Sequence, residues 1–138
     1  MGTRTRILAG AALLVSLFSS PSPGHHSFAA EYDSDKPVTV TGAVDHVKWV
    51  NPHAYIYINV TGEDGAPVLW AFETLSPNAL ARQGWTRSSL EPGDEVKIEG
   101  FMAKDGLPLS DGSGALHANS RAITRPDGTR VYGGPAPR

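Results

Sequence analysis

The chain carries five histidines and no cysteine, so imidazole nitrogens are the transition-metal ligands it offers most readily. His25 and His26 are adjacent near the start of the sequence and directly follow Gly24. If the chain is cleaved after Gly24, the new terminal amine and Nδ1 of the same histidine can close a chelate ring on a metal ion. This amine has an ordinary pKa of about 8, so a metal can displace its proton near neutral pH.

A second imidazole would complete a set of three nitrogen donors, and the candidates are His26, His53 and His117. Nitrogen ligands in tetragonal geometry suit Cu(II) or Ni(II), and the affinity order of the divalent metals favours copper. We therefore predict a site for Cu(II) or another divalent ion, zinc included, formed by His25, His26, His53 and His117. The alternative is that these histidines are solvated or bond locally, because the chain lacks spacings such as His-x-x-x-His.

The prediction of a free His25 amine depends on a secretory signal peptide over residues 1–24. Two arginines precede a short apolar stretch at 7–18, and small and helix-breaking residues follow at 19–24. A segment that spans a bilayer needs about 20 apolar residues, and this stretch is shorter. The sequence therefore predicts cleavage, no stable membrane insertion afterwards, and a periplasmic or secreted protein. The alternatives are a cut after Ala29 and an uncleaved anchor.

A second group of candidate residues lies on one face of an expected strand. His53, Tyr55 and Tyr57 are spaced two apart, so their rings project from the same side, and Trp49 and Asn51 precede them at a turn. In small five-stranded barrels, aromatic rings on such a face stack on bases or sugars. These five residues are the candidate ligand-binding face. The alternative is that the tyrosines only cover the barrel or pack under a loop.

Charge and composition narrow the classes of partner. The chain has 12 Lys and Arg residues against 14 Asp and Glu residues, a net charge of −2, and it lacks the basic surface that nucleic-acid binding requires. A small molecule, a glycan or an envelope protein is the expected partner of a monomer or weak oligomer. The sequence contains no nucleophile elbow and no phosphate-binding glycine loop. We predict a binding module and no enzyme, with a metal-dependent redox enzyme as a less favoured alternative.

Alternating apolar residues predict the elements that must position these side chains. Strands are expected over 38–50, 53–60, 68–73, 95–102 and 115–124, and one helix over 76–84. Ser76 is a good N-cap for this helix, Pro77 fits its first turn and Gly84 fits its C-terminal end. The residues assigned to the core include Ile56, Ile58, Trp70, Phe72 and Trp85.

The first expected strand changes phase close to Gly42, which indicates a bulged and sharply bent strand, and Gly100 permits a second bend. Three strands, a helix and two strands, with bends of this kind, follow the plan of the oligonucleotide/oligosaccharide-binding (OB) fold. We predict an all-β fold, a small five-stranded OB-like Greek-key barrel with one short helix between strands three and four. The expected segments are a signal peptide at 1–24, an N-terminal arm at 25–37, the barrel at 38–125 and a C-terminal tail at 126–138.

Six short motifs are distributed along the chain after residue 24. They are His25-His26-Ser27-Phe28-Ala29-Ala30-Glu31-Tyr32, Trp49-Val50-Asn51-Pro52-His53, Trp70-Ala71-Phe72-Glu73, Ser76-Pro77-Asn78-Ala79-Leu80, Gly84-Trp85-Thr86 and Pro92-Gly93-Asp94-Glu95-Val96. In this combination the chain resembles the bacterial exported proteins grouped as domain of unknown function 6152. The resemblance implies export, and it supplies no activity, cofactor or site residue.

Overall fold

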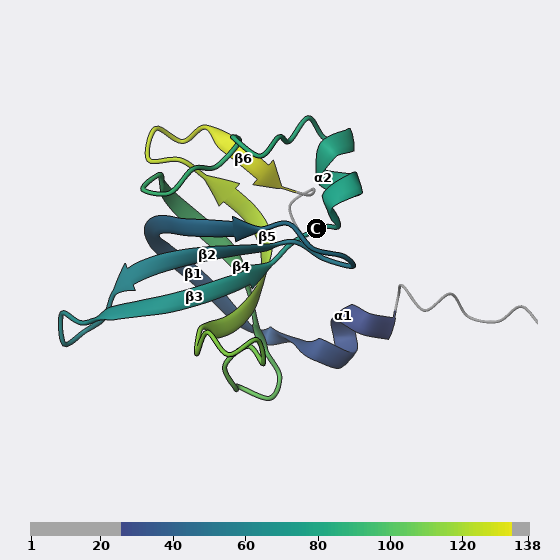
Figure 1. The fold of residues 1–138 in the computed structure, drawn as a ribbon. Helices are drawn as coiled ribbons and strands as arrows, with labels where there is room; N and C mark the ends of the chain where they lie inside the picture. The colour runs from purple at the N-terminus through teal and green to yellow at the C-terminus, as the bar shows by residue number, and fades with distance from the viewer. Residues whose placement is uncertain (1–25, 134–138) are drawn as a thin grey trace, which may run out of the picture.

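The structure, a computed structural model, describes residues 26–133, which form a small barrel with two short helices (Figure 1). The elements follow the chain as α1 (His26–Glu31), β1 (Tyr32–Lys48), β2 (Tyr55–Thr61), β3 (Pro67–Glu73), α2 (Pro77–Arg82), β4 (Glu95–Ala103), β5 (Leu116–Thr124) and β6 (Arg130–Gly133). Within this described part, neither helix has the length and apolar character needed to cross a bilayer.

Five of the strands close into a barrel. The strand order is β3-β2-β1-β4-β5-β6, and a parallel pairing of β3 with β5 joins the two ends of the first five strands. All other pairs are antiparallel, and α2 lies between β3 and β4 in the chain. This arrangement confirms the predicted five-stranded barrel with one short helix between strands three and four.

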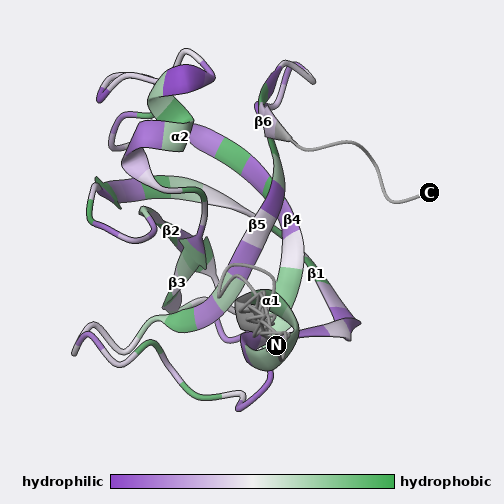
Figure 2. Ribbon diagram, turned by 90° about the vertical axis from the view of Figure 1, so that its right-hand side faces the viewer, coloured by the Kyte–Doolittle hydropathy of each residue, from purple (hydrophilic) through white to green (hydrophobic). Residues whose placement is uncertain are grey.

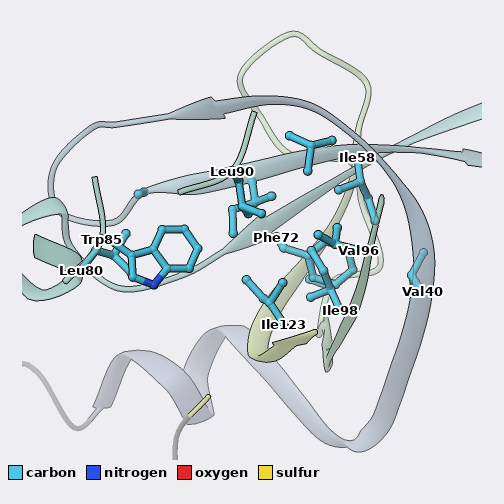
Figure 3. Close-up of a cluster of buried hydrophobic side chains, with 13 residues drawn as sticks. Val40, Ile58, Phe72, Leu80, Trp85, Leu90, Val96, Ile98 and Ile123 are labelled. Atoms are coloured by element: carbon cyan, nitrogen blue, oxygen red, sulfur yellow. The ribbon is translucent and has the colours of Figure 1, made fainter. Parts of the chain in front are cut away.

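The barrel interior is filled by thirteen buried apolar residues from β1 to β5, from α2 and from the loops beside these elements (Figure 3). Ile56, Ile58 and Phe72 are completely buried and Trp85 is nearly so, as predicted. Trp70 is only partly buried and stacks on Phe72, with the ring centroids 5.6 Å apart. Full burial of one such side chain stabilises the fold by about 1.5–3 kcal/mol. Because the chain has no cysteine, this packing takes the place of disulfides.

Both predicted bends are present in the barrel strands. The β1–β2 register shifts between Val44 and His46, and the β4–β5 register shifts between Glu99 and Gly100. A Cβ atom on Gly100 would overlap the carbonyl oxygen of Asn119, so only glycine permits this close approach of the two strands. Hydrophilic and hydrophobic residues alternate along the curved strands (Figure 2), and in the first part of β4 exposed and buried residues alternate in the same way.

The predicted helix is confirmed as α2. The Oγ atom of Ser76 accepts a hydrogen bond of 3.3 Å from the backbone N–H of Ala79, which is the N-cap interaction that the sequence predicted. Gly84 has a φ of +87°, the left-handed conformation that ends a helix at low cost for glycine. The chain therefore leaves α2 where the sequence indicated.

The first strand begins earlier than predicted. It starts at Tyr32 and not at Val38, so the expected N-terminal arm at 25–37 is α1 followed by the first part of β1. This part contains a polar run, 33–36, without apolar alternation, and its pairing with β4 is irregular between Tyr32 and Pro37. This part of β1 is formed by backbone pairing with β4, and its side chains do not alternate between apolar and polar. The sequence pattern therefore could not predict it.

The expected C-terminal tail also contains a strand. Within 126–138, β6 pairs with β5 through Ile123 opposite Tyr132 and Ala122 opposite Gly133. Trp85 donates its indole N–H to the carbonyl of Val131 at 3.1 Å, which ties β6 to the segment after α2. The sequence did not predict this strand, because it is only four residues long and the segment around it is rich in glycine.

Candidate functional site

A buried carboxylate lies at the end of β3. Glu73 is 8% exposed, and a buried charge is costly unless hydrogen-bond donors surround it. Its Oε2 accepts hydrogen bonds from the hydroxyls of Tyr32, at 2.7 Å, and Tyr55, at 3.1 Å. Its Oε1 lies 2.6 Å from Nδ1 of His53. Three donors thus occupy three of the about four acceptor positions of a carboxylate, and one is left.

The hydrogen bonds around Glu73 fix where the protons of both histidines lie. Because the hydroxyl of Tyr32 donates to Glu73, its oxygen accepts from Nε2 of His117, which is 2.9 Å away. His117 therefore carries a proton on Nε2. His53 carries one on Nδ1, facing Glu73, so its Nε2 is available as an acceptor or a metal ligand.

Strand register brings these side chains together. Tyr55 lies directly opposite Glu73 in the antiparallel β2–β3 pair. His117 lies opposite Ala71 in the parallel β3–β5 pair, so it shares a face with Glu73 and is two residues away in register. Tyr32 is the first residue of β1 and enters the group from α1. The parallel pairing that closes the barrel therefore also assembles the site.

Helix α1 adds a second carboxylate. The backbone N–H of Lys104 donates to the carbonyl of Glu31 at 2.8 Å, and its ammonium donates to the carbonyl of Ala29. Phe28 packs against Tyr32, with the ring centroids 5.6 Å apart. These contacts dock α1 against the barrel and place Glu31 beside the buried residues.

One carboxylate oxygen of Glu31, one of Glu73 and one ring nitrogen of His117 lie within 4.8 Å of one another. Burial raises the pKa of Glu31, and the negative charge of Glu73 raises it further. A cation between these groups would relieve the repulsion. We call the whole group the Glu73 cluster. It consists of Glu31, Tyr32, His53, Tyr55, Glu73 and His117.

The two tyrosines of the cluster stay protonated over a wide pH range. Burial is the largest cause that raises the pKa of Tyr32, followed by its hydrogen bond to Glu73 and the charge of that residue. Burial also raises the pKa of Tyr55, and the charge of Glu73 and the hydrogen bond to it add to the effect. Neutral phenols therefore serve as donors to the buried carboxylate.

Two pockets border the cluster. One has a volume of about 210 Å³, and Glu31, His53 and Glu73 lie in its wall. The other has a volume of about 370 Å³, and its wall includes Glu31, His117 and Lys104. Glu31 borders both pockets, so an ion or small molecule can reach it from either pocket.

The structure brings together three of the residues that the sequence singled out. His53 and His117, both predicted as metal ligands, contact the Glu73 network, and Tyr55 of the predicted ligand-binding face does the same. The remaining predicted ligands, His25 and the side chain of His26, lie outside the described residues. The N-terminal chelate therefore stays a prediction.

The other residues of the predicted ligand-binding face lie apart from the cluster. Tyr57 is 1% exposed; its hydroxyl donates to Asp111 of the loop before β5, and His46 stacks on its ring with centroids 4.2 Å apart. Trp49 packs partly against the core, and Asn51 is exposed beside its cis bond to Pro52. Tyr57 therefore packs under a loop, which was the alternative considered for it.

Sequence reasoning missed Glu31, Tyr32 and Glu73 as site residues. For Glu73 a signal existed, because the hairpin turn after β2 sets the register that places it opposite Tyr55. Glu31 and Tyr32 reach the cluster through α1 and the early start of β1. The apolar pattern predicted neither of these elements.

Replacing the buried carboxylate tests how much the cluster contributes to stability. Glu73→Gln loses the charge that three donors surround, and we expect the free energy of unfolding to fall by about 2–3 kcal/mol in urea titrations. Glu99→Gln is the matched control, because Glu99 forms an exposed ion pair with Lys97 at 3.1 Å. Its loss should be about 0.5 kcal/mol or less. Equal effects of the two substitutions would contradict the role of Glu73.

The raised tyrosine pKa values predict a loss of stability at alkaline pH. In the unfolded chain tyrosines lose their protons near pH 10, whereas the folded chain keeps Tyr32 and Tyr55 protonated. Their contribution is complete below about pH 10 and decreases as the pH rises above it. We expect Tyr32→Phe to flatten the fall in the free energy of unfolding between about pH 10 and 11.5. An unchanged slope in this variant would show that Tyr32 is not held in its protonated form.

Comparison with known proteins adds a family and no activity. A family model described as a family of unknown function (DUF6152) matches residues 12–111, which include Glu31, His53 and Glu73 and end before His117. No curated protein and no solved structure matched the chain. The match covers most of the 138 residues, in agreement with the six motifs. The chain therefore belongs to the DUF6152 family of unknown function.

Proposed function

We propose that this protein is an exported binding module for a divalent metal ion, copper(II) in particular, and that the Glu73 cluster holds the ion. The observation that carries the proposal is the approach of donor atoms of Glu31, Glu73 and His117 to within 4.8 Å of one another. Export is supported by the signal-peptide pattern in residues 1–24. The expected location is the periplasm or the cell exterior.

The donor set suits a borderline transition metal. Carboxylate oxygens and imidazole nitrogens are ligands of zinc, and imidazole also binds copper(II), which stands above zinc in the divalent affinity order. Glu73 and His117 are 8% and 7% exposed, so little water competes with an ion at these two groups. Among the described residues, Oε1 of Glu73 accepts from His53 alone and keeps one acceptor position, whereas an ion at Oε2 would compete with the hydroxyls of Tyr32 and Tyr55.

Metal binding requires the donor atoms of the cluster, which now lie within 4.8 Å of one another, to move closer together. Nε2 of His117 and Oε2 of Glu73 are 4.0 Å apart. Donors at bond lengths of 2.0–2.2 Å in a tetrahedral or tetragonal site are separated by about 3–3.5 Å. The two groups must therefore approach by about 1 Å or less, and the ion replaces the Nε2 proton that now bonds to Tyr32. His53 supports this geometry, because its bond to Oε1 orients the carboxylate.

The proposed site keeps one of the ligands that the sequence predicted, His117, and adds two carboxylates. A second arrangement remains, in which the His25 amine and its imidazole chelate the ion with His53. It is supported by the position of α1, because Phe28 and Glu31 of this helix line the same pocket as His53. Nε2 of His53 would be the ligand in this arrangement, because Nδ1 faces Glu73.

Copper(II) titration of the chain that begins at His25 tests the proposal by calorimetry. We expect one ion per chain and at least about tenfold weaker binding for His117→Gln. Glutamine keeps a donor near the hydroxyl of Tyr32, so the fold should survive, which circular dichroism checks. His46→Gln is the control, because His46 pairs with Asp45 at 2.7 Å and stacks on Tyr57, outside the cluster. Its affinity should equal that of the parent chain.

A chain with one extra serine before His25 separates the two arrangements. Binding at the Glu73 cluster should be unchanged by this addition, because the cluster does not use the terminal amine. Loss of binding on addition of serine, together with full binding by His117→Gln, would assign the ion to the N-terminal chelate. Absence of copper(II) and zinc(II) binding in every variant would overturn the proposed function.

A further inference from the structure

The pocket of about 210 Å³ contains features that the metal proposal does not use. It lies between α1, the end of β3 and the middle of β5, and Thr74, Asn119 and Tyr132 line it together with Glu31 and Glu73. His117 is not among its lining residues. A molecule in this pocket would therefore reach the carboxylates of the Glu73 cluster without touching His117.

Thr74 supplies an unused hydrogen-bonding group in the wall of this pocket. The residue is 7% exposed, and among the described residues its Oγ1 is a buried side-chain atom without a hydrogen-bond partner. Burial raises the pKa of the Tyr132 phenol, and the nearby Thr74 hydroxyl lowers it. The two hydroxyls are nevertheless not in hydrogen-bond geometry. A buried hydroxyl without a partner destabilises the folded chain. A ligand that bonds to Thr74 would recover this energy.

The charge of the pocket favours a cation. Two carboxylates, Glu31 and Glu73, line it, and among residues 26–133 no lysine or arginine does. His53 is the remaining titratable nitrogen in the wall, and its proton already faces Glu73. An anion would meet two negative groups in a partly dehydrated space, whereas a cation would be attracted by both.

The remaining walls are apolar and aromatic. Phe28, Tyr32, Leu75 and Tyr132 surround the charged end with rings and an aliphatic side chain. Aromatic faces attract ammonium groups and also cover alkyl chains. At about 30 Å³ for each water-sized group, the pocket holds a molecule of about seven non-hydrogen atoms. The lining and the size together fit a short organic molecule with one positively charged end.

We propose that this pocket binds a small organic cation, a primary ammonium group on a short alkyl chain. The ammonium donates hydrogen bonds to Oγ1 of Thr74 and to the carboxylates of Glu31 and Glu73, and the alkyl chain packs against Phe28 and Tyr132. The pocket does this without a metal ion. The inference goes beyond the proposed function and does not depend on it, because Thr74 is not a metal ligand and His117 is outside the pocket.

Amide NMR titration with n-butylammonium, in the presence of a metal chelator, tests the proposal. n-Butanol and butyrate are the matched probes, because they carry a neutral or a negative group on a chain of similar length. We expect n-butylammonium to shift the amide signals of Phe28, Thr74 and Tyr132 with saturation, and the other two probes to leave them unchanged. Equal binding of n-butanol would overturn the proposal, because the pocket would then be merely apolar.

Two substitutions locate the cation. Thr74→Val has nearly the same shape without the hydroxyl, and we expect it to weaken n-butylammonium binding about tenfold. Thr39→Val, on the exposed side of β1, is the control and should leave the affinity unchanged. Glu31→Gln should weaken binding to a similar extent. Unchanged affinity in both Thr74→Val and Glu31→Gln would overturn the proposal.

These experiments test the proposed metal site and the proposed ammonium pocket independently of each other. His117→Gln should weaken copper(II) and leave n-butylammonium binding unchanged, whereas Thr74→Val should do the reverse. If n-butylammonium does not bind while copper(II) binding still depends on His117, the inference is wrong and the proposed function stands. If n-butylammonium binds through Thr74 while no metal binds, the proposed function is wrong and the inference stands.

Discussion

The burial of one carboxylate, Glu73, is the constraint on which this end of the barrel depends. A charge that is 8% exposed needs several hydrogen-bond donors, and these donors come from elements far apart in the sequence. Tyr55 is supplied by β2, His53 by the turn before it, and Tyr32 by the junction of α1 and β1. Polar contacts with Glu73 therefore help to hold the α1–β1 junction against the barrel, in addition to apolar packing.

The same burial gives the cluster its chemistry. A carboxylate with its donors on one side remains negative toward the other side, and Glu31 adds to this negative potential. A metal ion and an organic ammonium would both be attracted by that negative potential. The two proposed sites differ in the neutral group that lies beside the carboxylates. The imidazole of His117 lines one pocket together with Glu31, and the hydroxyl-bearing Thr74 lines the other together with Glu31 and Glu73.

The sequence predicted most of the barrel, because side-chain alternation reports burial directly. Ile56, Ile58 and Phe72 were assigned correctly to the core, as was the capped helix α2. The beginning of β1 and the strand β6 could not be predicted, because backbone pairing forms them without an apolar pattern. The site was predicted in part. His53 and His117 were recognised by residue type, but the approach of His117 to Glu73 depends on the parallel β3–β5 register, which leaves no local signal.

Anomalous diffraction at the copper edge, from crystals grown with copper(II), tests the central claim most directly. The account predicts a peak enclosed by Glu31, Glu73 and His117, with the hydroxyl of Tyr32 moved away from Nε2 of His117. A peak elsewhere on the chain, with the hydrogen bonds of Glu73 unchanged, would contradict the claim that this buried carboxylate is a metal ligand.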